Sequence, residues 1–112
     1  MYLKIMQQDN LITQMKKGIL PLVVLLIISK QDSYGYQISS EIEKTLGFEV
    51  ADGTIYPILM RLCKDQVIEP YWVQKESGMP RKYYKITEAG RKYMNDLTGY
   101  YLNMTEHIAQ LI

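Results

Sequence analysis

Cysteine, histidine, phenylalanine and tryptophan each occur only once in this chain of 112 residues. The single cysteine, Cys63, cannot form an internal disulfide, which is typical of a protein that works in a reducing compartment such as the cytosol. His107 has no Cys/His cluster around it from which to build a metal site, and no second histidine for a catalytic triad. A glycine-rich phosphate loop is also missing from the sequence. We therefore expect no metal, no other cofactor and no enzymatic activity.

Net charge is nearly absent as well, at +1, so the chain has no global field that would attract an acidic partner. The distribution of charge is uneven, however. Residues 31–59 carry one basic side chain against five acidic ones. Residues 60–92 carry four acidic side chains against eight basic ones, which are Arg61, Lys64, Lys75, Arg81, Lys82, Lys85, Arg91 and Lys92. Such a local excess indicates a polyanionic partner even in a chain that is nearly neutral.

The longest apolar run, within residues 18–30, is about half as long as a membrane span requires. Lys16 and Lys17 precede it and imitate the charged end of a signal peptide, but no cleavage site of small residues follows and Asp9 lies upstream. We expect a helix that is buried on most of its circumference, in a cytoplasmic protein without a membrane segment.

Apolar periodicity and turn residues predict four helices and one hairpin. The first helix covers about residues 11–29, and Pro21 either kinks it or opens its second part. The second covers about ten residues from Tyr36, with Asp32 or Ser33 as N-cap types and Gly47 as the stop. Residues 71–73 and 83–86 are strand formers around a Gly/Pro turn, which predicts a hairpin. Thr87 then caps a last helix.

The third helix, within residues 51–70, contains Pro57 near its amino end. At 100° per residue, one face holds Ile55, Ile58, Leu59 and Leu62, and the outward face holds Pro57, Met60, Arg61 and Lys64. Thr54 lies at the border. With Thr54 as N-cap the proline is the third helical residue and removes no bond, whereas with Asp52 as cap one bond is lost. The outward face suits DNA, although an ordinary amphipathic surface helix has the same pattern.

Three segments together resemble the PadR family of bacterial transcriptional regulators, over about residues 15–95. They are "YGYQISSEIEK" (34–44), "DGTIYPILMRLCKDQVIE" (52–69) and "SGMPRKYYKITEAGR" (77–91). Gln37 stands where the family often has glutamate, and Cys63 and Gln66 replace an acid and a glycine. Without that glycine we expect the third helix to end in an altered turn. The short tail resembles the compact branch of the family, which has a single C-terminal helix.

The resemblance implies a fold that is mostly α with a small β-hairpin. Residues 1–86 would form a winged helix-turn-helix DNA-binding domain and residues 87–112 a C-terminal dimerisation helix, in one compact unit. The expected partner is a double-stranded DNA operator. We expect DNA contacts from the second helix, the third helix and the wing, at Tyr36, Thr54, Tyr56, Arg61, Lys64, Lys75, Arg81 and Lys82. Trp72, Tyr83 and Tyr84 are expected to pack within the hairpin.

The last helix carries an apolar heptad seam, which predicts a homodimer interface. Its residues are Met94, Leu97, Tyr101, Met104, Ile108 and Leu111. Tyr100 and Tyr101 are candidates to line a site for a small aromatic effector, which the resemblance suggests at the dimer interface. Gly90 is expected to leave the first turn of this helix easy to deform.

The function expected from these features is a sequence-specific repressor that binds a palindromic operator as a homodimer and is released by a small aromatic ligand. A winged-helix module for protein partners and a secreted or membrane-anchored fragment are the alternatives. Arg61 and the basic wing favour DNA binding over the former.

Overall fold

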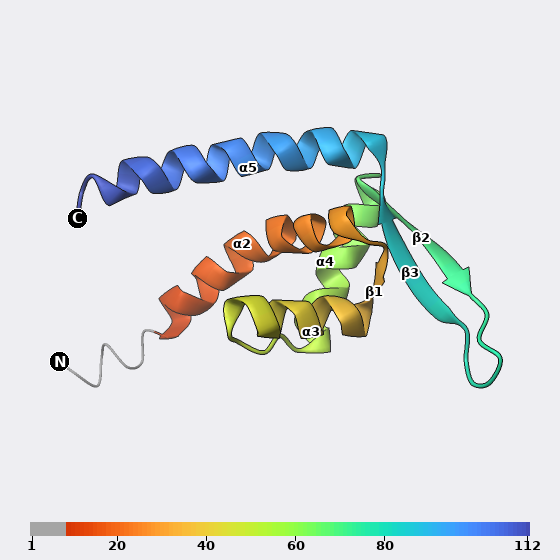
Figure 1. The fold of residues 1–112 in the computed structure, drawn as a ribbon. Helices are drawn as coiled ribbons and strands as arrows, with labels where there is room; N and C mark the ends of the chain where they lie inside the picture. Colours follow the sequence, from red (N-terminus) through yellow and green to blue (C-terminus); the bar gives the residue numbers. More distant parts are fainter. Residues whose placement is uncertain (1–8) are drawn as a thin grey trace.

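The structure of the protein is a computed structural model that describes residues 9–112 (Figure 1). Its elements, in chain order, are α2 (Asp9–Lys30), β1 (Ser33–Tyr34), α3 (Gly35–Leu46), α4 (Asp52–Lys64), β2 (Ile68–Val73), β3 (Arg81–Ile86) and α5 (Glu88–Ala109). Helix α2 lies between α5 on one side and the α3–α4 pair on the other, and the β2–β3 hairpin projects away from the helices. The predicted class, mostly α with a small β part, is confirmed.

Helix α2 supplies the centre of the hydrophobic core. Its buried side chains are Leu20, Leu22, Val24, Leu25 and Ile28. By length and composition alone the stretch Asn10–Lys30 is apolar enough to cross a membrane. Its second half packs in the core, but residues 10–18 are largely exposed, so the expectation of a helix buried on most of its circumference is wrong for the first half. Pro21 lies inside one continuous helix, so the alternative in which it opens a helix is wrong. It removes the bond that the Lys17 carbonyl would otherwise accept.

The link between α2 and α3 differs from the expected N-cap. Neither Asp32 nor Ser33 caps α3, because residues 33 and 34 form the short strand β1, which pairs with β3. Tyr34 is the N-cap residue, and its backbone N–H donates to the side-chain oxygen of Gln37 at 3.1 Å. Gly47 ends α3 as predicted, in the left-handed conformation (φ 79°). The helix-turn-helix is thus α3, residues 47–51 and α4.

The small sheet is antiparallel throughout, with the strand order β1-β3-β2. Hairpin β2–β3 is the predicted wing, and β1 adds a third strand that the sequence analysis did not anticipate. Pairing runs from Ile68 with Ile86 at the core end to Val73 with Arg81 near the tip. Consequently Ile68 and Tyr84 are buried, while the far end of the hairpin is exposed.

Helix α4 ends in a turn with a left-handed residue, a conformation usually taken by glycine but here taken by Gln66. Gln66 adopts φ 62°, and two backbone bonds close the turn: Gln66 N–H to the Cys63 carbonyl at 2.9 Å, and Val67 N–H to the Leu62 carbonyl at 3.1 Å. This is a Schellman motif. The expectation of an altered turn is therefore wrong; glutamine adopts the glycine conformation, at a cost of about 1–2 kcal/mol.

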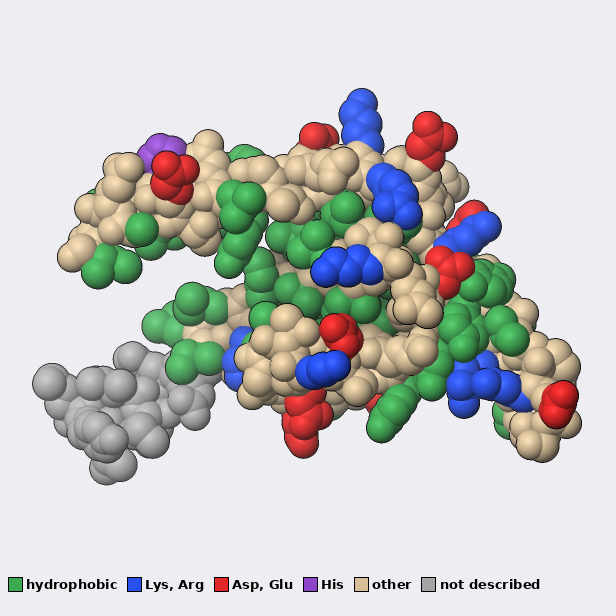
Figure 2. All heavy atoms as spheres, viewed as in Figure 1, with side chains coloured by type: hydrophobic (Ala, Val, Ile, Leu, Met, Phe, Trp, Pro, Cys, Tyr) green, Lys and Arg blue, Asp and Glu red, His purple; other side chains and the backbone are tan. Residues whose placement is uncertain are grey.

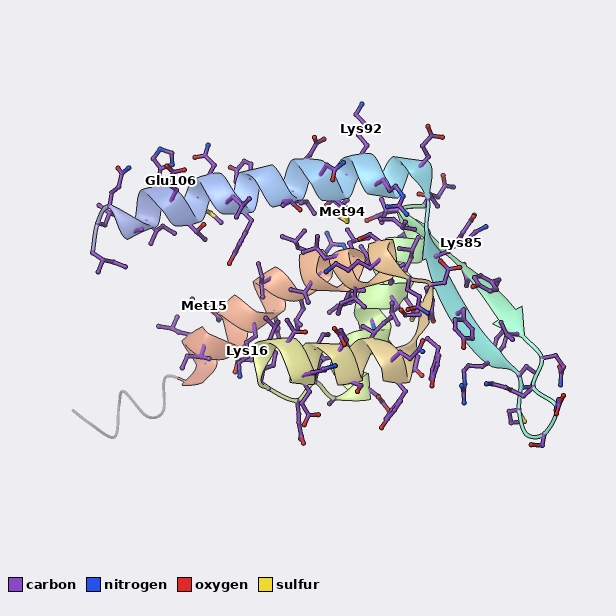
Figure 3. All side chains as sticks on the ribbon, viewed as in Figure 1. Met15, Lys16, Lys85, Lys92, Met94 and Glu106 are labelled. Atoms are coloured by element: carbon purple, nitrogen blue, oxygen red, sulfur yellow. The ribbon has the colours of Figure 1, made fainter. Side chains whose placement is uncertain are left out.

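Helix α5 begins as predicted at Thr87, whose hydroxyl oxygen accepts a bond from the Gly90 N–H at 2.9 Å. Gly90 is buried against the backbone of Val67, and a Cβ there would lie 1.9 Å from the Val67 carbonyl oxygen. The first turn of α5 is therefore docked closely, and the idea that Gly90 makes it deformable is wrong. Figure 3 shows Met94 pointing toward α2 and Lys92 pointing away from it.

Candidate nucleic-acid interface

Helix α4 separates a buried face from an exposed one, as its periodicity predicts. Ile55, Leu59 and Leu62 are buried in the core. The exposed face presents Tyr56, Met60, Arg61 and Lys64, with Tyr56 at 51% and Met60 at 71% exposure. Two aromatic or thioether side chains exposed next to two cations form a surface that can meet both base edges and phosphates.

Helix α4 starts earlier than in either alternative, one residue before the Asp52 cap and three before the Thr54 cap. Ala51 is the N-cap, and its carbonyl accepts bonds from the N–H groups of Thr54 and Ile55 at 2.9 and 3.1 Å. Thr54 is therefore the third helical residue and half-buried, rather than the cap. Pro57 is the sixth helical residue, so the carbonyl of Gly53 loses its helical donor, and glycine at that position reduces the clash with the ring.

The start of α3 lies against the exposed face of α4. A Cβ at Gly35 would lie 3.5 Å from the hydroxyl oxygen of Tyr56, which places the two helices in contact at this point. Tyr36, the next residue, is 75% exposed. The structure thus places Tyr36, the α3 residue predicted to contact DNA, next to the point where α3 meets α4.

One face of the wing continues the surface of α4. Lys82 lies opposite Trp72 in the strand pairing, and its Nζ is 5.7 Å from the ring centroids of both Trp72 and Tyr84. Burial raises the pKa of the Cys63 thiol on α4, and the charge of Lys82 lowers it by a smaller amount. Tyr84, beside which Lys82 lies, is buried in the core cluster that also holds Leu59 and Leu62 of α4.

The other face of the wing holds a cluster of tyrosines with Arg81. Its guanidinium lies 4.1 Å from the centroid of the Tyr34 ring, which packs edge-on against Tyr83 at 5.3 Å. Tyr83 in turn stacks on Tyr71, and the Tyr71 hydroxyl donates to the Asp32 carboxylate at 2.6 Å. That bond, together with partial burial and the carboxylate charge, raises the pKa of Tyr71. The cation–π contact of Arg81 with Tyr34 thus ties the wing to β1.

The eight predicted DNA-contact residues therefore do not all share one face. Tyr36, Tyr56, Lys64 and Lys82 lie on or beside the exposed side of α4. Arg81 lies on the opposite side of the hairpin, and Lys75 is half-buried in the loop before the tip. Met60 and Trp72 were absent from the predicted set; Trp72 is 64% exposed, so the expectation that it packs within the hairpin is wrong, whereas Tyr84 is buried.

Arg61 lies at the border between the exposed face of α4 and a groove of about 490 Å³ under α5. From α5 the groove is lined by Tyr93, Leu97, Tyr100, Tyr101 and Met104. From α2, α4 and the cap after α4 it is lined by Lys17, Gly18, Ile19, Pro21, Leu22, Pro57, Ile58, Arg61, Leu62 and Asp65. The predicted effector residues Tyr100 and Tyr101 thus line the same groove as residues of α4. Figure 2 shows hydrophobic side chains gathered along the side of α5 that faces α2.

The heptad seam of α5 divides into a buried part and an exposed part. Met94 is 9% exposed and belongs to the core of its own chain, so its assignment to a dimer interface is wrong. Leu97 is half-buried against the same core. Tyr101, Met104 and Ile108 are 37%, 47% and 51% exposed, and Leu111 at 87% lies beyond the end of the helix. An unpartnered apolar stripe remains on the second half of α5.

No group of His, Cys, Asp and Glu side chains that could hold a metal ion is found among residues 9–112. The only histidine of the chain, His107, is exposed, and its Nδ1 lies 2.7 Å from the Asn103 carbonyl oxygen. This side chain therefore contacts the backbone near the end of α5 and is not part of a metal-binding group in the described residues.

A helix-turn-helix followed by a basic hairpin is the winged-helix architecture of DNA-binding regulators. The model of the transcriptional regulator PadR-like family matches residues 24–96. Because this match covers more than half of the chain, the protein belongs to the PadR-like family of transcriptional regulators, whose members are transcription factors that bind DNA.

Individual relatives agree with this assignment. An uncharacterized protein from Lysinibacillus sphaericus is 36% identical over 94 residues, which are 82% of this chain and 86% of the relative. A solved PadR-like transcriptional regulator from Bacillus cereus is 34% identical, with a TM-score of 0.77 and coverage of 88% of this chain and 95% of that one. A transcriptional regulator from Clostridium thermocellum is 27% identical, with a TM-score of 0.80 and the same two coverages, 88% and 95%.

Proposed function

We propose that this regulator is a cytoplasmic repressor that binds a palindromic operator as a homodimer. The observation that carries the proposal is the exposed face of α4, which presents Arg61 and Lys64 and, beside the start of α3, Tyr56. A helix that buries one side in the core and exposes cations on the other fits the major groove, and a basic hairpin beside it fits the flanking backbone.

Assembly as a homodimer is supported by two apolar surfaces that lack cover in the single chain. One is the exposed stripe of α5 at Tyr101, Met104 and Ile108. The other is the amino end of α2, where Leu11, Ile12 and Met15 are 57%, 52% and 74% exposed. Two copies related by a two-fold axis bury such surfaces and present two recognition helices to half-sites about 10 base pairs apart. A dimer on promoter DNA represses by excluding polymerase, without any further contact.

The test is a gel-shift assay with the DNA upstream of the regulator's own gene, at two salt concentrations. Lys82→Ala removes one phosphate contact, so it weakens binding to operator and scrambled DNA alike and reduces the log–log salt slope by about one unit. Arg61→Ala lowers operator affinity by about 1–3 kcal/mol if its guanidinium reads a base. Operator binding by both variants that equals the parent would refute this interface.

A small aromatic effector is the second part of the proposal, supported by the groove under α5. Its lining combines Tyr93, Tyr100 and Tyr101 with the cation of Arg61, a set that suits a flat ring. Because the groove is lined by α4 itself, a ligand there contacts the DNA-binding helix directly. It shifts the equilibrium only if it binds the DNA-free state better than the bound one.

The effector is tested by adding planar cationic dyes and phenolic acids to the preformed operator complex. We expect at least one compound to release DNA from the parent, and Tyr100→Ala, which changes the groove outside the dimer stripe, to weaken that release while it still binds the operator. If no such compound releases DNA from a protein that binds its operator, the effector is abandoned and the repressor is controlled by its own abundance.

A further inference from the structure

Trp72 is the only tryptophan of the chain and one of its most exposed aromatic side chains, at 64%. It lies on β2 directly opposite Lys82 on β3, and the Lys82 Nζ is 5.7 Å from the centroid of its ring. A large indole in that position gains little from the fold, because most of its surface stays in water. Packing within the hairpin therefore does not explain why a tryptophan occupies this exposed position.

The side of the hairpin on which Trp72 lies follows from the strand pairing. Side chains alternate between the two sides of a strand, so Trp72, Lys82 and the buried Tyr84 share one side. Tyr84 is buried in the core cluster that also holds Leu59 and Leu62 of α4, and the Lys82 Nζ lies 5.7 Å from the centroid of its ring. The other side carries Arg81 and the exposed ion pair of Lys85 with Glu69 at 3.4 Å. Trp72 therefore extends the surface that starts at the exposed face of α4.

We propose that Trp72 binds the sugar–phosphate backbone of the DNA beside the site read by α4. Its ring packs on a deoxyribose and its Nε1–H donates to a phosphate oxygen, while Lys82 neutralises the adjacent phosphate. Two observations select DNA as the occupant: the ammonium group beside the indole, which favours a polyanion, and the position of the pair on the side of the hairpin whose Tyr84 packs in the core with α4. The inference rests on the proposed DNA-binding function and adds a residue that the family motifs do not include.

Contacts with sugar and phosphate contribute affinity without reading sequence. Trp72→Ala is therefore expected to weaken operator and scrambled duplexes by the same factor, about tenfold, which corresponds to the loss of one good contact. Trp72→Phe keeps the packing on the sugar but removes the N–H donor, and it should fall between the parent and the alanine variant. Because the side chain is exposed, both variants should keep the melting temperature of the parent.

A matched pair of lysines tests which side of the hairpin meets DNA. Lys82→Ala and Lys85→Ala remove the same charge from the same strand, on opposite sides. We expect Lys82→Ala to weaken both duplexes and Lys85→Ala to leave the affinity within about twofold of the parent. Equal losses from both lysines would show a general effect of charge and would overturn the assignment of the side.

The decisive readout is the fluorescence of Trp72, the sole indole. Saturation with either duplex at low salt should change its emission and protect it from quenching by acrylamide. Unchanged emission and unchanged affinity of Trp72→Ala, in a protein that a gel-shift shows to be bound, would overturn this inference and leave the proposed function standing. A parent protein that retards no duplex would overturn both.

Discussion

Gly90 and Gly99 occupy the same helix, yet their surroundings make the same substitution act in opposite directions. At Gly90 a Cβ would lie 1.9 Å from the carbonyl oxygen of Val67 and 2.9 Å from a side-chain carbon of Ile86, closer than real contacts allow. At Gly99 nothing lies within 4 Å. The pair therefore measures how closely α5 is docked onto the winged-helix domain.

The expected magnitude for Gly90→Ala combines three terms. Overpacking in a tight site costs about 3 kcal/mol at the upper end of its usual range. The Val67 carbonyl that must move also accepts the Thr87 N–H at 3.1 Å, and weakening that bond costs about 1 kcal/mol. Replacing glycine by alanine in a helix returns about 1 kcal/mol. The net loss is about 3 kcal/mol, or about 12 °C in melting temperature for a domain of this size.

Gly99→Ala has only the helix-propensity term, so we expect a gain of about 1 kcal/mol and a rise of about 4 °C. Thermal unfolding followed by circular dichroism, at one protein concentration for all variants, measures both shifts. A Gly90→Ala variant as stable as Gly99→Ala would refute the close docking of α5 and would restore a deformable first turn as a route for regulation.

Three other predictions address the cap, the assembly and the wing. Gln66→Gly removes the strain of a left-handed residue at the end of α4, but glycine loses more backbone entropy on folding. The net effect should be a stabilisation of about 0.5–1 kcal/mol in denaturant unfolding. A loss of stability would contradict the strain argument. Met104→Glu places an unpaired charge in the exposed stripe of α5, so the molar mass from light scattering should shift toward that of the monomer. The control Asn103→Glu should leave the dimer intact. A dimer unaffected by either variant would exclude the stripe as the dimer interface. Asp32→Asn removes the charged acceptor that raises the pKa of Tyr71, so spectrophotometric titration should show one tyrosine ionising earlier. Since that raised pKa favours the neutral phenol in the folded state, the stabilisation is present below about pH 10 and is lost as pH rises through the folded pKa; an identical titration curve in the variant would refute the bond.

The elements that could be predicted from the sequence are those set by local chemistry. Period and turn residues give the four helices and the hairpin, because Gly47 and Thr87 stop and start helices by their own backbone and side-chain preferences. The buried face of α4 follows from the same reasoning, since Ile55, Leu59 and Leu62 recur at helical spacing and are buried.

What could not be predicted depends on tertiary docking. Strand β1 forms because β3 offers an edge to Ser33 and Tyr34, and from the sequence Ser33 looks like a helix cap. Met94 belongs to the seam by spacing but is covered by its own chain, and Arg61 belongs to the exposed face by angle but also lines the groove under α5. Exposure of Trp72 likewise depends on how far the hairpin projects beyond the core, which no local pattern encodes.

Footprinting on the DNA upstream of the regulator's own gene tests the central claim most directly, namely that two copies of α4 read a palindromic operator. We expect two protected half-sites about 10 base pairs apart, centred on inverted repeats, with a stoichiometry of two chains per duplex. Protection should weaken steeply as salt rises, because phosphate contacts release counterions. Absence of any protected region at low salt, from a folded dimer, would contradict the account; a single unpaired half-site would contradict the dimeric operator.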